Sequence, residues 1–151
     1  MNMTRRQIFA LSAGAATYGL FAFAPDRAWA SVEAAEKALE AFTGGAEPQS
    51  GTISLTAPEI AENGNTVPVS ITVDSPMTED SYVESVTILA DGNPNAEVAT
   101  FYFTPMSGRA EATTRIRLAQ TQNVIAVAKM NDGSVYSDRK EVKVTIGGCG
   151  G

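Results

Sequence analysis

The stretch TVPVSITVD, residues 66–74, places four branched apolar residues at every second position: Val67, Val69, Ile71 and Val73. Because successive side chains of an extended strand point to opposite faces, these four share one face and the residues between them share the other. The pattern predicts a β-strand with one buried face. Pro68 has no backbone N–H to donate, which predicts that this strand lies at a sheet edge or contains a bulge.

The same alternation recurs along the chain from Gly51 onward. Further strands are expected at residues 52–57, 82–91, 97–105, 113–120, 123–130 and 140–146, with Gly, Pro, Asn and Asp clustered between them. The run at 123–130 is apolar almost throughout, as in a central strand buried on both faces. Asp132-Gly133 is typical of a tight hairpin turn. Seven strands without helices between them predict an all-β fold, an immunoglobulin-like antiparallel β-sandwich of about seven strands.

The first thirty residues have the features of a signal peptide. Arg5 and Arg6 precede an apolar segment, residues 8–24, and Ala28-Trp29-Ala30 is a small-x-small motif that predicts cleavage after Ala30. The paired arginines resemble the twin-arginine export pattern, whose cargo crosses the bacterial inner membrane folded. This predicts a periplasmic protein; the alternative is a membrane anchor that is not cleaved. Residues 1–30 carry three arginines and one aspartate, so their removal changes the net charge from −6 to −8.

One helix is expected after the signal peptide, at residues 31–45. Val32, Ala35, Leu39 and Phe42 recur with helical spacing, and this stripe is better explained by core packing than by a partner helix. Gly44-Gly45 is a typical C-terminal stop. The predicted organisation is therefore a signal peptide (1–30), an amphipathic helix (31–45), a β-sandwich carrier domain (46–146) and a glycine-rich tail (147–151).

The composition excludes several classes of function. A net charge of −6 without a basic cluster does not suit a nucleic-acid partner, since phosphate neutralisation needs many Lys and Arg. The chain has no histidine, the commonest general base and metal ligand, and one cysteine cannot form an internal disulfide or a cysteine metal cluster. No catalytic residues, no metal site and no membrane association after signal removal are therefore predicted.

The single cysteine stands in the sequence GGCGG at 147–151. Its neighbours Gly147, Gly148, Gly150 and Gly151 have no side chains, so a flexible arm is expected, on which Cys149 reaches about 10 Å beyond the last strand. In an oxidising compartment an unpaired thiol indicates a reactive group or an intermolecular partner. Arg115 and Arg117 alternate with apolar residues and are expected on a solvent or partner face, with a role in substrate binding as the alternative.

This ending resembles the SoxY family, and so do PEIAENGNTVPVSITVDSPM (58–77), the segment from Glu97 to Ser134 and RKEVKVTIGGCGG (139–151). The resemblance implies a sulfur carrier that holds inorganic sulfur covalently on Cys149 and performs no chemistry of its own, with no cofactor. It implies a heterodimer with a SoxZ-like subunit that has no signal peptide. It also implies transient docking to a haem-containing SoxAX-like enzyme, a SoxB-like hydrolase and a SoxCD-like oxidase of thiosulfate oxidation.

Three other functions fit parts of the sequence. An exported immunoglobulin-like interaction module could crosslink through intermolecular disulfides of Cys149. A thiol oxidoreductase or cysteine hydrolase would need a base and a held geometry, which the glycine neighbours do not supply. A ubiquitin-like carrier also ends in Gly-Gly, but it activates its carboxylate with ATP and would leave Cys149 without a purpose.

Overall fold

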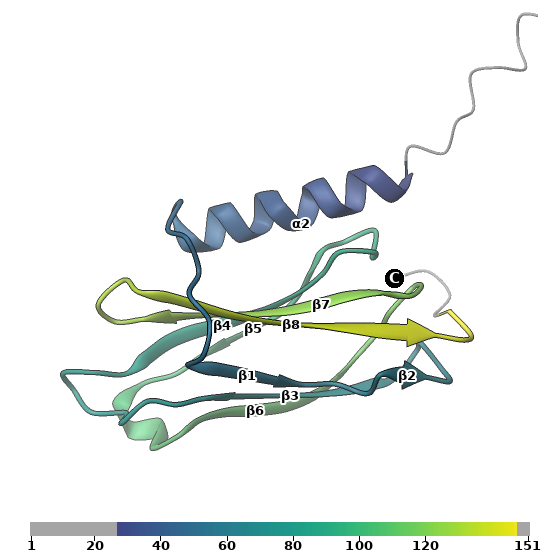
Figure 1. Ribbon diagram of the computed structural model, residues 1–151. Helices are drawn as coiled ribbons and strands as arrows, with labels where there is room; N and C mark the ends of the chain where they lie inside the picture. Colours follow the sequence, from purple (N-terminus) through teal and green to yellow (C-terminus); the bar gives the residue numbers. More distant parts are fainter. Residues whose placement is uncertain (1–26, 148–151) are drawn as a thin grey trace, which may run out of the picture.

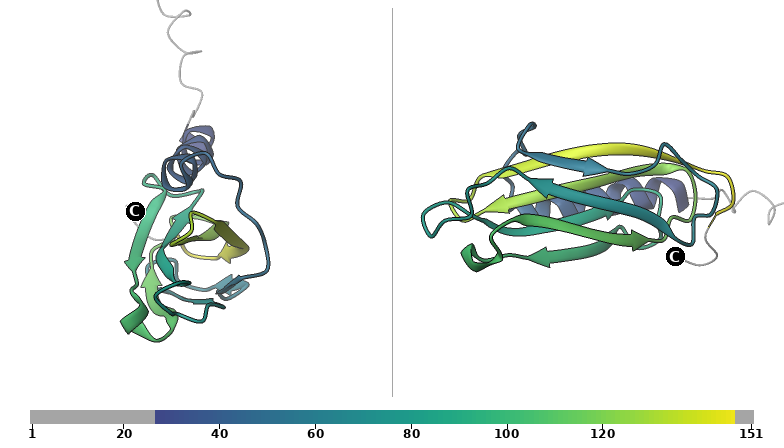
Figure 2. Two further views of the ribbon diagram at one scale, coloured as in Figure 1. Left: turned by 90° about the vertical axis from the view of Figure 1, so that its left-hand side faces the viewer. Right: turned by 90° about the horizontal axis from the view of Figure 1, so that it is seen from below.

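The computed structural model describes residues 27–147, with side chains described from Val32 onward. In chain order the elements are α2 (Arg27–Thr43), β1 (Ile53–Thr56), β2 (Ile60–Ala61), β3 (Val67–Val73), β4 (Val83–Ala90), β5 (Glu97–Tyr102), the 3-10 turn η1 (Pro105–Ser107), β6 (Ala110–Ile116), β7 (Gln122–Met130) and β8 (Val135–Val144). The strands form two sheets that face each other, as Figures 1 and 2 show. The predicted sandwich is confirmed.

The two sheets differ in size. One has three strands in the order β1-β3-β6, and the other has five in the order β2-β8-β7-β4-β5. Every named pair is antiparallel except β2 and β8, which run parallel. The prediction of about seven strands omitted β2, because a strand of two residues is too short to show alternation.

The core lies between the sheets and follows the predicted alternation. Val67, Val69, Ile71 and Val73 are all buried, and they pack in one cluster with Val86 and Ile88 of the facing sheet. Burial of branched side chains at this spacing stabilises each strand by about 1.5–3 kcal/mol per side chain. The hydrophobic pattern therefore sets which face of each strand turns inward.

Pro68 lies in a different place from the one predicted. Its strand, β3, is the middle strand of the smaller sheet, not an edge. However, β1 pairs only with Ser70–Val73, whereas β6 pairs with Val67–Val73. Pro68 therefore lies beyond the end of β1, where one flank of the central strand has no partner strand and a missing N–H breaks no ladder.

Helix α2 covers the outer face of the larger sheet (Figure 1). Ala35 is buried and Leu39 and Phe42 are half-buried, in contact with a second cluster that includes Leu89 and Val127. This confirms core packing for Ala35, Leu39 and Phe42, whereas Val32, the first residue of the predicted stripe, is 45% exposed. The larger sheet is buried on both faces at β7, as its continuous apolar run predicts.

The helix limits differ at both ends from the predicted 31–45. α2 ends at Thr43, and Gly44, with φ of 66°, donates its N–H to the Glu40 carbonyl at 2.9 Å. The predicted glycine stop is therefore confirmed. The helix begins at Arg27, upstream of the predicted limit of 31, and it runs through Ala30. Cleavage after Ala30 stays a prediction.

The hairpin between β7 and β8 has the predicted turn. Gly133 has φ of 86°, and the Met130 N–H donates to the Ser134 carbonyl at 2.9 Å. β8 begins directly after this turn, at Val135, and is longer than the predicted 140–146 segment. Its C-terminal half carries the chain toward Gly147.

Candidate functional site

The residues predicted to carry function fall mostly outside the described part of the chain. Those outside are Arg5, Arg6, Gly148, Cys149, Gly150 and Gly151. Gly147 is the last described residue, and it is exposed. The structure thus describes the segment that precedes Cys149 in the sequence, residues 145–147, here termed the tail root.

The tail root is tethered to the segment that contains β2. The Lys143 N–H donates to the Glu59 carbonyl at 2.9 Å, and the Thr145 N–H donates to the Ala61 carbonyl at 3.1 Å. The Thr145 hydroxyl adds a bond to the Glu62 carbonyl at 3.0 Å. Because these bonds continue past Val144, the chain stays fixed after β8 ends.

Gly64 joins the tail root to the loop between β6 and β7. Its N–H donates to the Ile146 carbonyl at 2.8 Å, and its own carbonyl accepts from the Leu118 N–H at 2.7 Å. Gly64 and Leu118 are buried. Three segments that are far apart in the sequence therefore meet at one backbone position.

Gly147 approaches the same loop too closely for any side chain. A Cβ built on Gly147 would overlap the carbonyl oxygen of Ala119. Glycine is thus needed here for space, a reason that the sequence alone does not show. The prediction of a flexible arm for Gly148 to Gly151 stays a prediction.

Two buried amide side chains hold the loop that Gly147 contacts. Asn93 and Gln122 are each 5% exposed. The Asn93 Nδ2 donates to the Arg117 carbonyl at 2.8 Å, and its Oδ1 accepts from the Ala119 N–H at 2.9 Å and from the Gln122 Nε2 at 2.9 Å. Burial of such groups is favourable only when they are hydrogen-bonded, so this network fixes the loop backbone.

Gln122 extends the network to Gly92. The Gly92 N–H donates to the Gln122 Oε1 at 2.7 Å, and a Cβ on Gly92 would lie 2.7 Å from the Gln122 Cβ. The cluster Asp91-Gly92-Asn93-Pro94 is typical of a turn, but nothing in the sequence marks Asn93, or Gln122 at the start of β7, as buried. No local pattern distinguishes a buried turn amide from a solvated one, since both suit the backbone of a turn.

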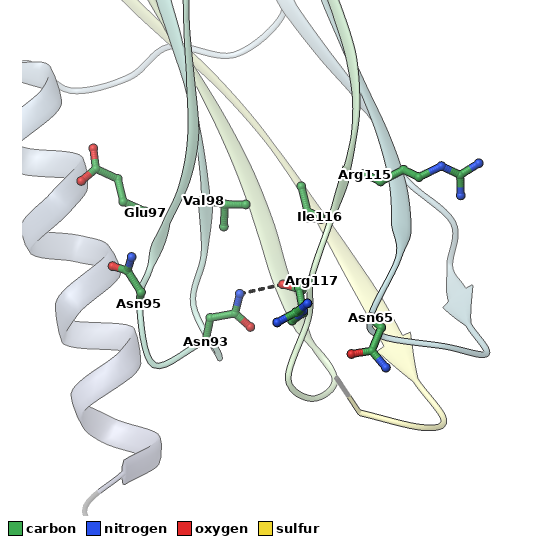
Figure 3. A pocket seen from close by; sticks show the side chains of 8 residues that line it. All are labelled: Asn65, Asn93, Asn95, Glu97, Val98, Arg115, Ile116 and Arg117. Carbon is green, nitrogen blue, oxygen red and sulfur yellow. Dashed lines mark hydrogen bonds between the residues drawn. The ribbon is translucent and has the colours of Figure 1, made fainter. Parts of the chain in front are cut away.

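A shallow pocket of about 400 Å³ lies beside the tail root, and Figure 3 shows its lining. The lining residues are Asn65, Asn93, Asn95, Glu97, Val98, Arg115, Ile116 and Arg117. Arg115 points away from Asn93, and its Nη1 lies 3.5 Å from the Thr66 hydroxyl. Arg115 and Arg117 are both exposed, as predicted. The pocket lining combines amide groups, which both donate and accept hydrogen bonds, with the guanidinium of Arg117 and the carboxylate of Glu97.

Among residues 27–147, no three His, Cys, Asp or Glu side chains gather in a group that could hold a metal ion. Within the same residues, no helix combines the length and apolar character needed to cross a membrane.

Comparison with protein families gives one match. The model of the family described as "Sulfur oxidation protein SoxY" matches residues 39–149, a range that includes Cys149. The solved structure of the sulfur carrier protein SoxY from Chlorobium limicola f thiosulfatophilum is 34% identical in sequence. The match covers 74% of this chain and 96% of that one, with a TM-score of 0.60. A comparison with curated proteins finds no match.

Other solved structures share the fold at lower identity. A superoxide reductase (neelaredoxin) from Ignicoccus hospitalis is 20% identical, with a TM-score of 0.55, and the match covers 62% of this chain and 80% of that one. A single-residue variant of the same reductase gives 21% identity and a TM-score of 0.56, covering 81% and 93%. At this level of identity the likeness concerns the sandwich architecture alone.

Proposed function

The chain belongs to the SoxY family of sulfur oxidation proteins, and from this membership we propose that it carries inorganic sulfur covalently on Cys149. The observation that carries the proposal is the family match over residues 39–149, which reaches the single cysteine of the sequence. The geometry supports it, since Cys149 stands two residues beyond a fixed root and between glycines. A thiol so placed can enter a narrow active site without steric hindrance from neighbouring side chains.

The chemistry of loading is an oxidative S–S bond formation. The Cys149 thiol gives up its proton, its sulfur bonds to the outer sulfur of thiosulfate, and a haem-containing SoxAX-like enzyme would take up the two electrons one at a time. The thiolate is the form that reacts, and a solvated cysteine has an ordinary pKa of about 8.5, so part of it is ionised near neutral pH. A base within this chain is therefore not required for loading.

Unloading consumes water. A SoxB-like hydrolase cleaves the terminal sulfone, so that water oxygen enters the departing sulfate and one sulfur stays on Cys149 as a persulfide. A SoxCD-like oxidase then oxidises this sulfane sulfur, with water as the source of oxygen and its own redox centres as the electron acceptor. A second hydrolysis by the SoxB-like enzyme then releases the oxidised sulfur as sulfate and returns the Cys149 thiol. Each intermediate thus stays bonded to the carrier until it leaves as sulfate, and the carrier needs no cofactor of its own.

The proposal also includes a cellular compartment, the periplasm, and a partner, a SoxZ-like subunit. Arg5, Arg6 and cleavage after Ala30 support export to the periplasm by the twin-arginine route, which moves folded cargo. Such a route lets a SoxZ-like subunit without a signal peptide cross as the bound half of a heterodimer.

Intact-protein mass spectrometry tests the carrier function. The mature protein is isolated from cells grown with and without thiosulfate, and Cys149→Ser serves as the matched variant. We expect thiosulfate-dependent additions of sulfur species that map to the peptide containing Cys149 and are absent from the variant. An unmodified thiol, or only a disulfide dimer under both conditions, contradicts the proposal and favours the crosslinking module. Turnover of a thiol substrate by the purified protein alone favours the oxidoreductase.

A further inference from the structure

Asn63 and Gly64 form an Asn-Gly pair that contacts the tail root. In such a pair the backbone nitrogen of glycine can attack the side-chain amide carbon of asparagine, because glycine has no Cβ to hinder the approach. The attack releases ammonia and closes a succinimide ring, which water then opens to aspartate or isoaspartate. The net reaction exchanges ammonia for water and needs no oxidant, metal or enzyme. The sequence contains no other Asn-Gly pair.

The Asn63 side chain is placed favourably for this attack. It is exposed, and its Oδ1 accepts a hydrogen bond from the Asn65 N–H at 2.9 Å. This bond folds the side chain back along the peptide that follows it, as asparagine commonly does in turns. The same N–H can stabilise the negative charge that develops on Oδ1 as the ring closes. The local geometry therefore favours cyclisation.

The Gly64 nitrogen, in contrast, is held by the tail root. Its N–H donates to the Ile146 carbonyl at 2.8 Å, and Gly64 is buried. The nitrogen must lose this proton to attack, and hydroxide cannot reach a buried N–H that is bonded to a carbonyl. The Gly64 carbonyl also accepts from the Leu118 N–H at 2.7 Å, so the backbone is fixed on both sides of the residue. Cyclisation therefore requires that the contact with Ile146 opens first.

The contact with Ile146 depends on the rest of the tail root. The Thr145 N–H and hydroxyl each bond to a carbonyl of the segment around β2, at 3.1 and 3.0 Å. Gly147, on the other side of Ile146, lies so close to the Ala119 carbonyl that a side chain there would displace the root. Local opening of the root thus exposes the Gly64 N–H while the sheets stay folded.

We infer that Asn63-Gly64 is a site of spontaneous deamidation that the tail root protects. While the Ile146 carbonyl holds the Gly64 N–H, Asn63 stays an asparagine, and each opening of the root gives the Gly64 nitrogen a chance to attack. Isoaspartate adds one methylene to the main chain, so Gly64 can no longer meet Ile146 and Leu118 at once and the root stays released. Transient openings of the root thus accumulate as a covalent change. The reaction is independent of the group that Cys149 carries.

Two rates measured on the mature protein test this protection. One is the deamidation of Asn63 during incubation, followed by peptide mapping and mass spectrometry, and the other is the hydrogen exchange of the Gly64 amide, followed by NMR. Both need removal of the same Gly64 proton from the opened root, so both should change by the same factor. In Gly147→Ala we expect both rates to rise about tenfold, and in the matched control Gly148→Ala both should keep their wild-type values. A change in one rate without the other overturns the protection.

Unfolding the wild type tests the site without a variant. Guanidinium chloride removes the bond to Ile146, so Asn63 should deamidate at least about tenfold faster in the unfolded protein than in the folded one. Asn65, which is followed by the branched Thr66, is the internal control and should react more slowly than Asn63 in the unfolded protein. Equal rates at Asn63 in the folded and unfolded protein would overturn the protection, and an intact Asn63 in the unfolded protein would overturn the site itself.

Discussion

The two ends of the sandwich are held by hydrogen bonds of different range. At the hairpin end, residues 130–135, Ser134 donates to the Asp132 carboxylate across two residues, and Gly133 donates to the Met130 carbonyl. At the tail-root end, the Ala119 N–H reaches Asn93 across 26 residues, and Gly64 bonds to Ile146. The turn at the hairpin end forms from its own sequence, although Asn131 also bonds it to Tyr82 and Asp80. The network at the tail-root end exists only when distant segments have come together. This places the predicted carrier thiol beside the part of the fold that depends most on tertiary structure.

A glycine at each end makes the same point. Gly133 has φ of 86° and open space around its Cα, so it is needed for backbone conformation. Gly147 faces the Ala119 carbonyl, so it is needed for close approach. Glycine is thus required for two different reasons, a positive φ at Gly133 and the lack of space for a Cβ at Gly147. Only the positive φ can be recognised from a turn motif in the sequence.

The largest expected difference between the two ends is in the loss of unfolding free energy when one asparagine at each end is replaced by alanine. Asn93→Ala removes the partner of the Arg117 carbonyl, the Ala119 N–H and the Gln122 amide, all inside the protein, and should lower the free energy of unfolding by about 3 kcal/mol. Asn131→Ala, at the hairpin end, removes bonds to the Tyr82 N–H and the Asp80 carbonyl, which water can replace in part, so about 1 kcal/mol is expected. Urea denaturation measures both. Equal losses would contradict the assigned difference between the ends.

The next comparison exchanges each glycine for alanine. Gly147→Ala should release the tail root and raise the hydrogen-exchange rate of the Gly64 amide about tenfold, with little change in global stability. Gly133→Ala should lower global stability by about 1 kcal/mol, because alanine is strained at positive φ, and leave the Gly64 amide unchanged.

Gly148→Ala is the control for the tail root. It should leave the exchange of the Gly64 amide at the wild-type rate if Gly147 acts through space. The same increase in both variants would instead favour chain flexibility as the reason for glycine at both positions. Exchange followed by NMR resolves the single amide.

The smallest expected effect is a change in the pKa of Asp132 in the hairpin turn. Hydrogen bonds from the Ser134 hydroxyl, at 2.6 Å, and from its N–H hold the pKa of Asp132 below its ordinary value of 3.8. A lowered pKa means that the carboxylate stabilises the fold above about pH 3.8 and that this contribution is lost as the pH falls through the folded value. NMR titration of Asp132 should show the lowered pKa, and Ser134→Ala should bring it back toward 3.8. An unchanged pKa in that variant would contradict the assigned cause.

Several features of the fold could be predicted from the sequence because their cause is local. The alternation at Val67–Val73, the apolar run of β7, the Asp132-Gly133 turn and the glycine stop at Gly44 each depend on residues close together in the chain. Pro68 predicts an edge strand or a bulge, and it lies in neither, because the sequence does not show that β1 ends before it reaches that position. β2 was missed, since its two residues are held by β8 from the far end of the chain.

By itself, the sequence determined that strands with one apolar face must pair into a sandwich and that a single thiol stands between glycines. The reason is that strand period and glycine geometry are properties of a few consecutive residues. Only the tertiary structure decided where that tail starts. Asn93, Gln122, Gly64 and Ala119 lie far from Gly147 in the sequence, and their hydrogen bonds and close packing exist only after the sheets have closed. Long-range contacts of this kind leave no periodic pattern in the sequence, so they can be identified only in the folded structure.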